Sequence, residues 1–464
     1  MDTEKIKKII LISVIVIGIL GVVGVGVVVI NAIRNQSSAI PSTDTSATLR
    51  IWGLWENEGI MKSAIDAYKK VKPNITVSYS NREQISSNYK STLKSRLAEG
   101  NSQQVPDIFM IHNSWTEDFS KYMTPVPTTT FTSSQYTNTF FPAVSDSFTY
   151  KNNSYALPIG IDGLGVYYNK KLLTDKGYTL PAENWDQFKD QAKKLTRFDS
   201  NGNILVGGVG MGTMNNVDFS YEILSMLMLQ NGATMTDPTT GLTTFGTDAA
   251  ASSALKFYTD FATVDKGWNK TLPRDITMFA EGRLAMMFAP LWRADSIKKA
   301  NPTLDFDIAP VPQLANFSGT GRVDYADFWG YSVSSISSYK QESWDFLKFL
   351  TTPETLKLLN DTEKAERVTG EFYPRSDMVT NLSAVPFTDA FSKMMPTAKT
   401  WKMYDKESVS AIFKTDIDSS SGSSPLSTGS AGSILSGIAT KVDAIIANKN
   451  SPVSNLSSSA TSTK

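Results

Sequence analysis

Apolar positions follow two alternating spacings through the first part of the chain, and these spacings predict strands and helices in turn. Residues 49–51 and 75–79 alternate between apolar and polar side chains, which is typical of strands. Between them, residues 61–68 carry apolar side chains at helical spacing, and residues 85–97 form a second helical stripe. The short apolar run at 106–111 is suited to a buried parallel strand. The chain therefore opens with a β-α-β pattern that repeats.

The same alternation continues to the end of the chain. We expect helices at 185–195 (capped by Asn184), 220–230, 248–262, 343–350 and 434–446, and strands at 284–288 and 330–336. Strands that alternate with helices favour an α/β fold with mostly parallel sheets and helices on both faces.

The N-terminal segment has a different pattern. No residue is charged from Ile9 to Ile33, and as a helix the apolar part would reach roughly 33 Å, enough to cross a hydrocarbon core of about 30 Å. We predict an uncleaved transmembrane signal anchor at 9–33 that holds the protein at the plasma membrane. Lysines cluster before this segment, which places residues 1–8 in the cytoplasm and the rest of the chain outside.

Two further segments lack hydrophobic periodicity. Residues 34–48 are rich in Ser, Thr, Ala and Pro and are expected to form a flexible linker, and residues 451–464 a disordered tail.

Composition excludes several classes of protein. Lys plus Arg and Asp plus Glu are balanced at 45 each among 464 residues, so no excess positive charge favours nucleic acid as a partner. With no Cys and one His, thiolate and imidazole zinc sites and Cys nucleophiles are excluded, as is any Ser-His-Asp triad not built on His112. We expect no metal, no cofactor and no catalytic residue.

The remaining local motifs favour structural roles. Glycines fill most of 207–212 but lack the spacing of a nucleotide-binding loop, so we expect a turn or close packing there. The segment 199–203 resembles half of a calcium-binding loop but lacks the Glu at its twelfth position, and a turn is favoured. His112 follows a strand and is expected to be a hydrogen-bonded structural residue rather than a catalyst.

Aromatic residues stand beside polar ones at several predicted strand ends and loops. Sugars need both kinds of side chain, because their C–H faces stack on flat rings while their hydroxyls require directional hydrogen bonds. The pairs are Trp55-Glu56-Asn57, Asn113-Ser114-Trp115, Trp292-Arg293 and Asp327-Phe328-Trp329. Any one of these tryptophans could instead fill the core.

Several segments, in their order and spacing, resemble bacterial extracellular solute-binding proteins of the maltose-binding-protein-like group (solute-binding family 1). The resemblance covers nearly all of residues 48–450. The segments that carry it are Leu49-Arg50-Ile51-Trp52, Pro106-Asp107-Ile108, Tyr155-Ala156-Leu157-Pro158, Tyr167-Tyr168-Asn169-Lys170, Phe279 to Met286, Asp327 to Val333 and Tyr373-Pro374-Arg375. The group commonly has a lipid-modified Cys or a cleaved signal, and here a membrane helix takes its place.

The resemblance implies a two-lobed periplasmic-binding-protein-like fold (class II type) with a hinge between the lobes. It places residues 49–160 and 330–351 in an N-terminal lobe, and residues 161–329 and 352–450 in a C-terminal lobe. It also implies the substrate-binding component of an ABC transporter, which binds a sugar or oligosaccharide between the lobes and delivers it to permease subunits. We expect a monomer.

Carried over by motif position, the resemblance gives roles to individual residues. Glu56 and Asp162 would accept sugar hydroxyl protons, and Trp292 and Trp329 would stack on the sugar. Further contacts would come from Trp55, Asn113, Ser114, Trp115, Asn215, Asn216, Phe219, Arg293, Asp327, Tyr373 and Arg375.

Other functions are compatible with the same residues. Glu56 and Asp162 could act as the paired carboxylates of a glycoside-acting enzyme. The chain could also be a sensory receptor or a binder of a non-sugar solute, although the combination of Trp with Asn, Asp and Arg favours sugar.

Overall fold

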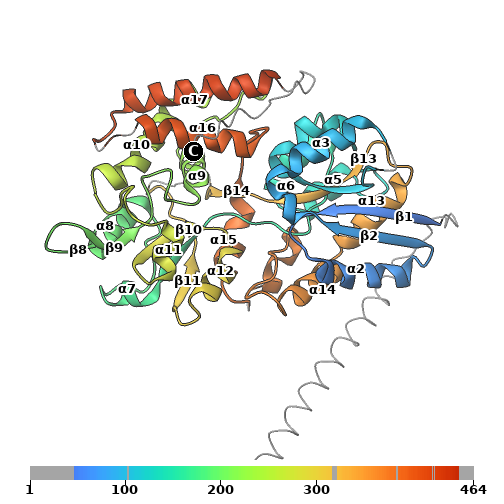
Figure 1. Ribbon diagram of the computed structural model, residues 1–464, viewed down its shortest axis with the longest axis horizontal. Helices are drawn as coiled ribbons and strands as arrows, with labels where there is room; N and C mark the ends of the chain where they lie inside the picture. Colours follow the sequence, from blue (N-terminus) through green and yellow to red (C-terminus); the bar gives the residue numbers. More distant parts are fainter. Residues whose placement is uncertain are drawn as a thin grey trace, which may run out of the picture. The chain divides into compact units, whose positions relative to one another are not determined.

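The structure is a computed structural model that describes residues 46–101, 104–315, 321–382, 385–420, 422 and 424–448. The predicted cytoplasmic segment, signal anchor and tail, and nearly all of the predicted linker, lie outside these residues. The described chain forms two compact units (Figure 1). The first contains the residues up to Met110, Tyr122–Thr132 and Tyr331–Gly370, and the second contains Ile111–Lys121, Ser133–Gly330 and the residues from Glu371 onward.

The first unit is built on a five-stranded sheet of order β2-β1-β3-β13-β4. Strand β1 (Ala47–Gly53) pairs in parallel with β2 (Ile75–Asn81) and with β3 (Ile108–His112). Strand β13 (Trp329–Ser334) pairs antiparallel with the short β4 (Met123–Thr124). The predicted β-α-β opening is confirmed, because the connections between three parallel neighbours must cross over the sheet.

Helices of the first unit pack against one another beside this sheet. Helix α2 (Glu58–Val71) begins at Asn57, whose side chain accepts a hydrogen bond from the Ile60 amide at 2.9 Å. It packs against α13 (Lys340–Leu350) and α14 (Pro353–Glu363). The predicted helix end at Leu350 is confirmed for α13, and Pro353 then starts α14, since the first turn of a helix needs no amide donor. The other helices among the described residues of this unit are η1 (Glu83–Asn88) and α3 (Tyr89–Glu99).

The second unit is built on a mixed sheet of order β11-β7-β10-β9-β8. Strand β7 (Gly165–Asn169) is antiparallel to both β10 (Leu284–Ala289) and β11 (Phe306–Ala309). Strand β9 (Ile204–Val209) is parallel to β10 and antiparallel to β8 (Arg197–Phe198). The expectation of mostly parallel pairing is wrong for this sheet. One reason is that β8 and β9 are joined by the tight 199–203 turn, which permits only an antiparallel hairpin.

The helices predicted in the second unit are present, and most of their ends agree within a few residues. They are α8 (Trp185–Leu195), α9 (Ser220–Gln230), α10 (Ala249–Thr263) and α17 (Thr428–Asn448), whereas α16 (Lys406–Ser420) was not predicted. Asn184 caps α8 as predicted, because its side chain accepts from the Gln187 amide at 3.0 Å. Helix α17 is the exception, since it begins six residues before the predicted start.

The other elements are short. They are η2 (Asn113–Trp115), α4 (Thr116–Phe119), η3 (Ser120–Tyr122), α5 (Ser133–Thr139), α6 (Pro142–Phe148), β5 (Thr149–Tyr150), β6 (Asn153–Ser154), α7 (Lys170–Thr174), η4 (Phe245–Thr247), α11 (Asp275–Ala280), α12 (Arg293–Ala300), β12 (Asp324–Tyr325), η5 (Ser376–Leu382), α15 (Asp389–Met394), η6 (Met395–Thr397) and β14 (Ala398–Lys399).

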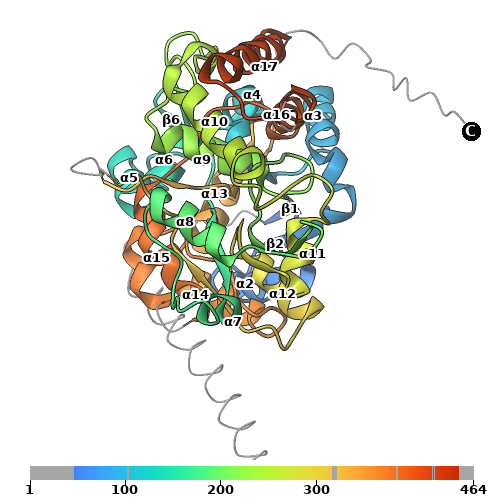
Figure 2. The same ribbon diagram turned by 90° about the vertical axis from the view of Figure 1, so that its left-hand side faces the viewer.

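Helix α17 is the one helix of the described residues that is long and apolar enough to cross a membrane by length and composition alone. One face of it is buried within the second unit and carries Leu435, Ile438 and Val442. It packs on α10 and α16 (Figures 1 and 2). These contacts are those of an amphipathic helix in a globular domain.

The boundaries of the two units differ from the predicted lobe boundaries. Residues 133–160 group with the second unit, where the Tyr136 hydroxyl donates to the Ala156 carbonyl at 2.7 Å and Phe140 forms a β-bridge with Arg375. Helix α14 groups with the first unit, because it packs on α2. Side-chain packing, which the lobe assignment by resemblance could not take into account, decides both cases.

The glycine run at 207–212 serves close packing. A Cβ atom on Gly208 would lie 1.9 Å from the carbonyl oxygen of Ala192 in α8, so only glycine lets the helix rest on β9. Gly212 has a φ of +101°, in the region that side chains rarely adopt. The predicted structural role of this run is confirmed.

We predict that Gly208→Ala lowers the free energy of unfolding by at least about 2 kcal/mol, because the new methyl group overlaps a backbone carbonyl that cannot move freely. Gly437→Ala is the matched control. Gly437 lies in α17 with open space around it, and alanine there should stabilise the helix by about 0.5–1 kcal/mol. Urea denaturation of both variants measures the difference, and equal effects would contradict the packing argument.

Candidate functional site

Trp292 stands at the end of β10, where the chain turns into α12. Its side chain is 48% exposed, and it is the only exposed tryptophan among the described residues. Two residues, Pro290 and Leu291, separate it from β10. A flat aromatic ring of this size normally avoids water unless it has a surface to bind, so Trp292 is the natural starting point for a site.

Two predicted site residues pack directly against the Trp292 indole. The guanidinium carbon of Arg293 lies 4.2 Å from the Trp292 ring centre and 5.5 Å from that of Phe219. Phe219, at the start of α9, meets the indole edge-to-face with ring centres 6.2 Å apart. The structure therefore brings together three residues that lie as much as 74 positions apart in the sequence. We call Phe219, Trp292 and Arg293 the aromatic platform.

Asp162 supports the turn that carries this platform. Its Oδ1 accepts the amides of Gly163 at 2.6 Å and Leu291 at 2.9 Å, and its Oδ2 accepts the amide of Trp292 at 3.3 Å. Burial raises the pKa of Asp162 to about 8, while the three amide donors oppose that rise. The carboxylate thus holds the turn by accepting backbone amides, which is ordinary chemistry for an Asp beside a Gly, and its predicted contact with sugar hydroxyls stays a prediction.

A cluster of charges lies behind the platform. The Arg293 guanidinium donates to Asp218 Oδ2 at 3.1 Å, and the Arg274 guanidinium donates to Asp218 Oδ1 at 2.7 Å. The Asp218 amide donates to Asp275 Oδ1 at 3.1 Å. Burial, and then the nearby Asp218 carboxylate, raise the pKa of Asp275 to about 7, and burial also lowers the pKa of Arg293. Asp218, Arg274 and Asp275 were not predicted, because a charged residue without an aromatic neighbour in the sequence cannot be distinguished from an ordinary surface residue.

A second polar network runs through the predicted residues near His112. His112 Nδ1 lies 2.8 Å from the Ser114 hydroxyl, and its Nε2 lies 2.8 Å from Asp327 Oδ1. Lys406 bonds to the other oxygen of Asp327 and lies 3.0 Å from Glu222. Although burial opposes it, Lys406 and His112 hold the pKa of Asp327 well below its usual range. The structural role predicted for His112 is confirmed, and Lys406 and Glu222 are additions that no sequence motif indicated.

Aromatic rings pack on this network. Trp329 is half-buried and meets both His112 and Trp115 edge-to-face, with ring centres 5.0 Å apart in each case. Trp115 is buried and stacks on Phe119 at 5.6 Å, as the core-filling alternative for a tryptophan requires. The Asn113 amide group donates to the Thr400 hydroxyl at 3.3 Å, and its buried Oδ1 has no hydrogen-bond partner among the described residues.

Four predicted residues are engaged elsewhere in the second unit. Asn216 is buried and bonds to the carbonyls of Asn269 and Leu272, and Asn215 donates to Asp418 at 2.6 Å. Arg375 forms a two-pronged pair with Asp377 at 2.9 and 2.6 Å, and Tyr373 is buried. Asn216 ties its loop to segment 269–272, and Arg375 pairs with a residue two positions along the chain, so both side chains already bond within the protein.

Trp55 and Glu56 belong to the first unit. Glu56 is buried, and its Oε2 accepts the Tyr331 hydroxyl at 2.9 Å. Its backbone carbonyl accepts the Tyr79 hydroxyl at 2.6 Å. Trp55 is half-buried, and its carbonyl accepts from Arg367 at 2.8 Å. These contacts fix the loop after β1 and leave the predicted sugar contacts of both residues untested.

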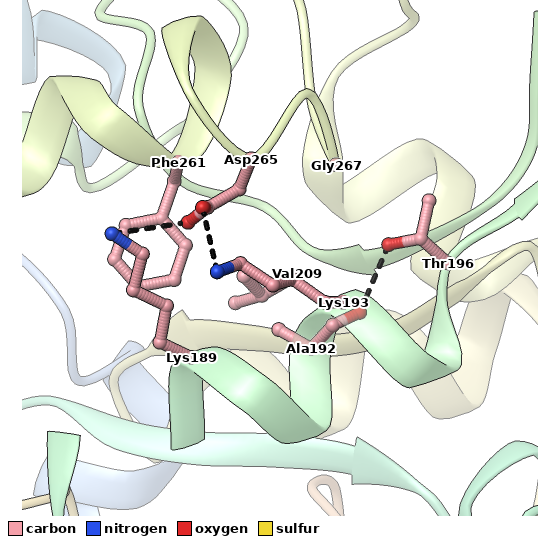
Figure 3. A pocket seen from close by; sticks show the side chains of 8 residues that line it. All are labelled: Lys189, Ala192, Lys193, Thr196, Val209, Phe261, Asp265 and Gly267. Atoms are coloured by element: carbon pink, nitrogen blue, oxygen red, sulfur yellow. Dashed lines mark hydrogen bonds and ion pairs between the residues drawn. The ribbon is translucent and has the colours of Figure 1, made fainter. Parts of the chain in front are cut away.

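A small pocket in the second unit lies away from these residues. Lys189 and Lys193 of α8 point toward the carboxylate of Asp265, at 3.3 and 3.0 Å, and Phe261 closes one side (Figure 3). The pocket is filled by its own ion pairs and is no candidate for solute binding. Among the described residues, no group of three or more His, Cys, Asp or Glu side chains could hold a metal ion.

Comparison with known families identifies the class of protein. Residues 63–363 match the family of bacterial extracellular solute-binding proteins, and this match covers more than half of the chain. The chain belongs to this family. The resemblance drawn from the sequence segments is thereby confirmed.

Individual relatives share low sequence identity with this chain. The multiple sugar-binding protein of Streptococcus mutans is 23% identical over 376 residues, which cover 78% of this chain and 84% of that protein. The maltotriose-binding protein of Pyrococcus abyssi is 22% identical over 315 residues, 65% of this chain and 61% of that protein. The chain spans 58% of the length of binding proteins from Brucella abortus and Brucella suis, with 25% identity.

Solved structures show the same fold. The sugar-binding protein MalE of Xanthomonas citri aligns with a TM-score of 0.70 and 18% identity, over 87% of this chain and 98% of that one. A substrate-binding protein of Listeria monocytogenes in complex with cycloalternan aligns with a TM-score of 0.64 and 18% identity, over 87% and 100%. The two-lobed α/β periplasmic-binding-protein-like fold is therefore confirmed.

We predict that Asp275→Asn reduces the loss of stability on raising the pH from about 4 to 7. The folded pKa, about 7, lies above the ordinary value of 3.8, so in this window the folded protein keeps a proton that the unfolded chain releases. Stability contributed by this group therefore falls as pH rises, and asparagine removes that slope while its oxygen can keep both amide bonds.

Urea denaturation at pH 4, 5.5 and 7 measures the difference between wild type and variant. Asp199→Asn is the control with the opposite sign, because amide donors lower the pKa of this exposed carboxyl. Parallel stability curves for wild type and Asp275→Asn would contradict the assignment.

Proposed function

We propose that this chain is the extracytoplasmic sugar-binding component of an ABC transporter. The observation that carries the proposal is the exposed Trp292 ring, held by Arg293 and Phe219 at the end of β10. In α/β sheets, ligands bind beyond the strand ends, where this ring lies. A flat exposed ring with a guanidinium group beside it offers both the stacking surface and the hydrogen-bonding chemistry that a pyranose requires.

The named relatives support a carbohydrate ligand. Among them are a maltotriose-binding protein and a multiple sugar-binding protein. Proteins of the same fold have been solved with tagatose, maltose, maltotriose or mannobiose bound. We infer that this chain also takes a sugar or short oligosaccharide as a monomer and passes it to the permease subunits of the importer.

The membrane location forms part of the proposal. Family membership supports a binding domain outside the cytoplasm. We infer that the uncharged segment 9–33 anchors the domain to the plasma membrane, because its length matches the hydrocarbon core.

A glycoside-acting enzyme is less supported than a binding protein. Hydrolysis needs one carboxyl group to donate a proton and another to attack or to activate water. Asp162 already accepts three amide hydrogen bonds, and Glu56 accepts the Tyr331 hydroxyl. Incubation with oligosaccharides separates the two functions, since a binding protein releases no product.

A thermal-shift screen tests the proposal on the full-length protein in detergent. We expect at least one of glucose, tagatose, maltose, maltotriose and mannobiose to raise the melting temperature, because a ligand at a hundred times its Kd stabilises the folded state by about 2.7 kcal/mol. Amino acids and dipeptides serve as the non-sugar comparison. A shift with these alone would favour the alternative of a non-sugar solute binder.

We predict that Trp292→Ala weakens binding of the sugar found in the screen by about 1–3 kcal/mol while unfolding stays cooperative. A half-exposed ring can be removed without opening the core. Phe198→Ala is the matched control, since Phe198 is also 48% exposed but lies on β8. Isothermal titration calorimetry decides, and an equal loss in both variants would remove Trp292 from the site.

A further inference from the structure

We propose that Asp218 is a positioning residue that fixes the Trp292 ring through Arg293. The proposal rests on the function proposed above, because the platform matters only if Trp292 binds the ligand. It assigns Arg293 the role of a support for the ring, whereas the family resemblance implied a direct contact between Arg293 and the sugar.

Asp218 is itself held from several directions. Its side chain is 5% exposed, and its two oxygens are divided between Arg293 and Arg274. Its amide bonds to Asp275, and its carbonyl accepts from Lys414 at 3.3 Å. A carboxylate fixed in this way provides a rigid anchor for any cation that pairs with it.

Arg293 connects the fixed Asp218 carboxylate to the Trp292 ring. Its guanidinium lies over the Trp292 indole and near the Phe219 ring, and its buried Nε has no hydrogen-bond partner among the described residues. Burying a guanidinium in this way is costly unless an anion compensates it. Asp218 is the anion that Arg293 contacts, so its loss would release the guanidinium toward water and leave the indole unsupported.

Asp162 restrains the same residue at its backbone. It accepts the Trp292 amide, while Arg293 covers the side chain. The ring is thus held both at its backbone and at its face before any ligand arrives. A binding group that is already ordered loses less entropy on binding and so binds more tightly.

The first test needs no sugar. Full-length protein in detergent is labelled with 5-fluorotryptophan, and the Trp292 resonance is identified by its absence in Trp292→Phe. We expect Asp218→Asn and Arg293→Lys to move this resonance toward the position of a solvent-exposed indole, because lysine keeps the charge but loses the planar contact. Asp260→Asn, which breaks the 2.7 Å pair with Lys256 in α10, is the matched control and should leave it in place.

The second test uses the sugar that gives the largest shift in the panel of glucose, tagatose, maltose, maltotriose and mannobiose. We expect Asp218→Asn to weaken binding about 3- to 10-fold in the wild-type background and to have no further effect in Trp292→Ala, since coupled residues are not additive. Calorimetric titration of the four proteins completes the cycle.

The outcomes separate the two proposals. An unmoved Trp292 resonance in both Asp218→Asn and Arg293→Lys overturns the positioning role, whether or not sugar binds. Equal losses from Asp218→Asn with and without Trp292 also overturn it, because they show that Asp218 acts independently of the ring. Absence of binding to every sugar in the panel overturns the proposed function and leaves the fluorine experiment to decide the positioning role.

Discussion

The hydrogen bonds between Asp162 and the turn after β10 are the contacts on which the candidate site depends. They connect residue 162 with residues 291 and 292, and so fix where β10 ends and where α12 begins. Strand β10 lies at the centre of its sheet and is paired with a strand on each side, so its end is well ordered by its neighbours. An exposed tryptophan recognises a ligand well only when its backbone is already ordered. If the ring lay on a mobile loop, the entropy lost in ordering that loop would offset part of the free energy of binding.

The sequence predicted individual elements and site residues better than it predicted the contacts between them. Helical and strand spacing predicted most of the longer helices and five of the strands, and the Trp292-Arg293 pair and Phe219 do meet in space. The charges behind them were missed, since Asp218 and Arg274 lie 56 positions apart and neither shows any pattern that reveals a partner. The antiparallel pairs of β7 were missed for a similar reason, because strand direction depends on long-range pairing that apolar spacing does not encode.

The two polar clusters of the second unit shift the pKa of their buried carboxyl groups in opposite directions. Around Asp327, burial opposes ionisation, but Lys406 and His112 bond to the carboxylate and hold its pKa down. Around Asp275, burial and then the nearby Asp218 carboxylate raise the pKa instead. The first cluster is an ion-pair network that fixes segments 112–114 and 327–329, whereas the second is sensitive to protonation near neutral pH.

Because the Arg293 guanidinium lies over one face of the Trp292 indole, only the opposite face of that ring is open to a ligand. On the proposed function, a sugar must present a face free of axial hydroxyls to that side, because an axial oxygen would prevent close C–H contact with the ring. Epimers that differ at a single carbon then differ in affinity even when their hydrogen-bonding groups are the same in number. A ring with one open face would therefore let this protein select sugars by their stereochemistry as well as bind them.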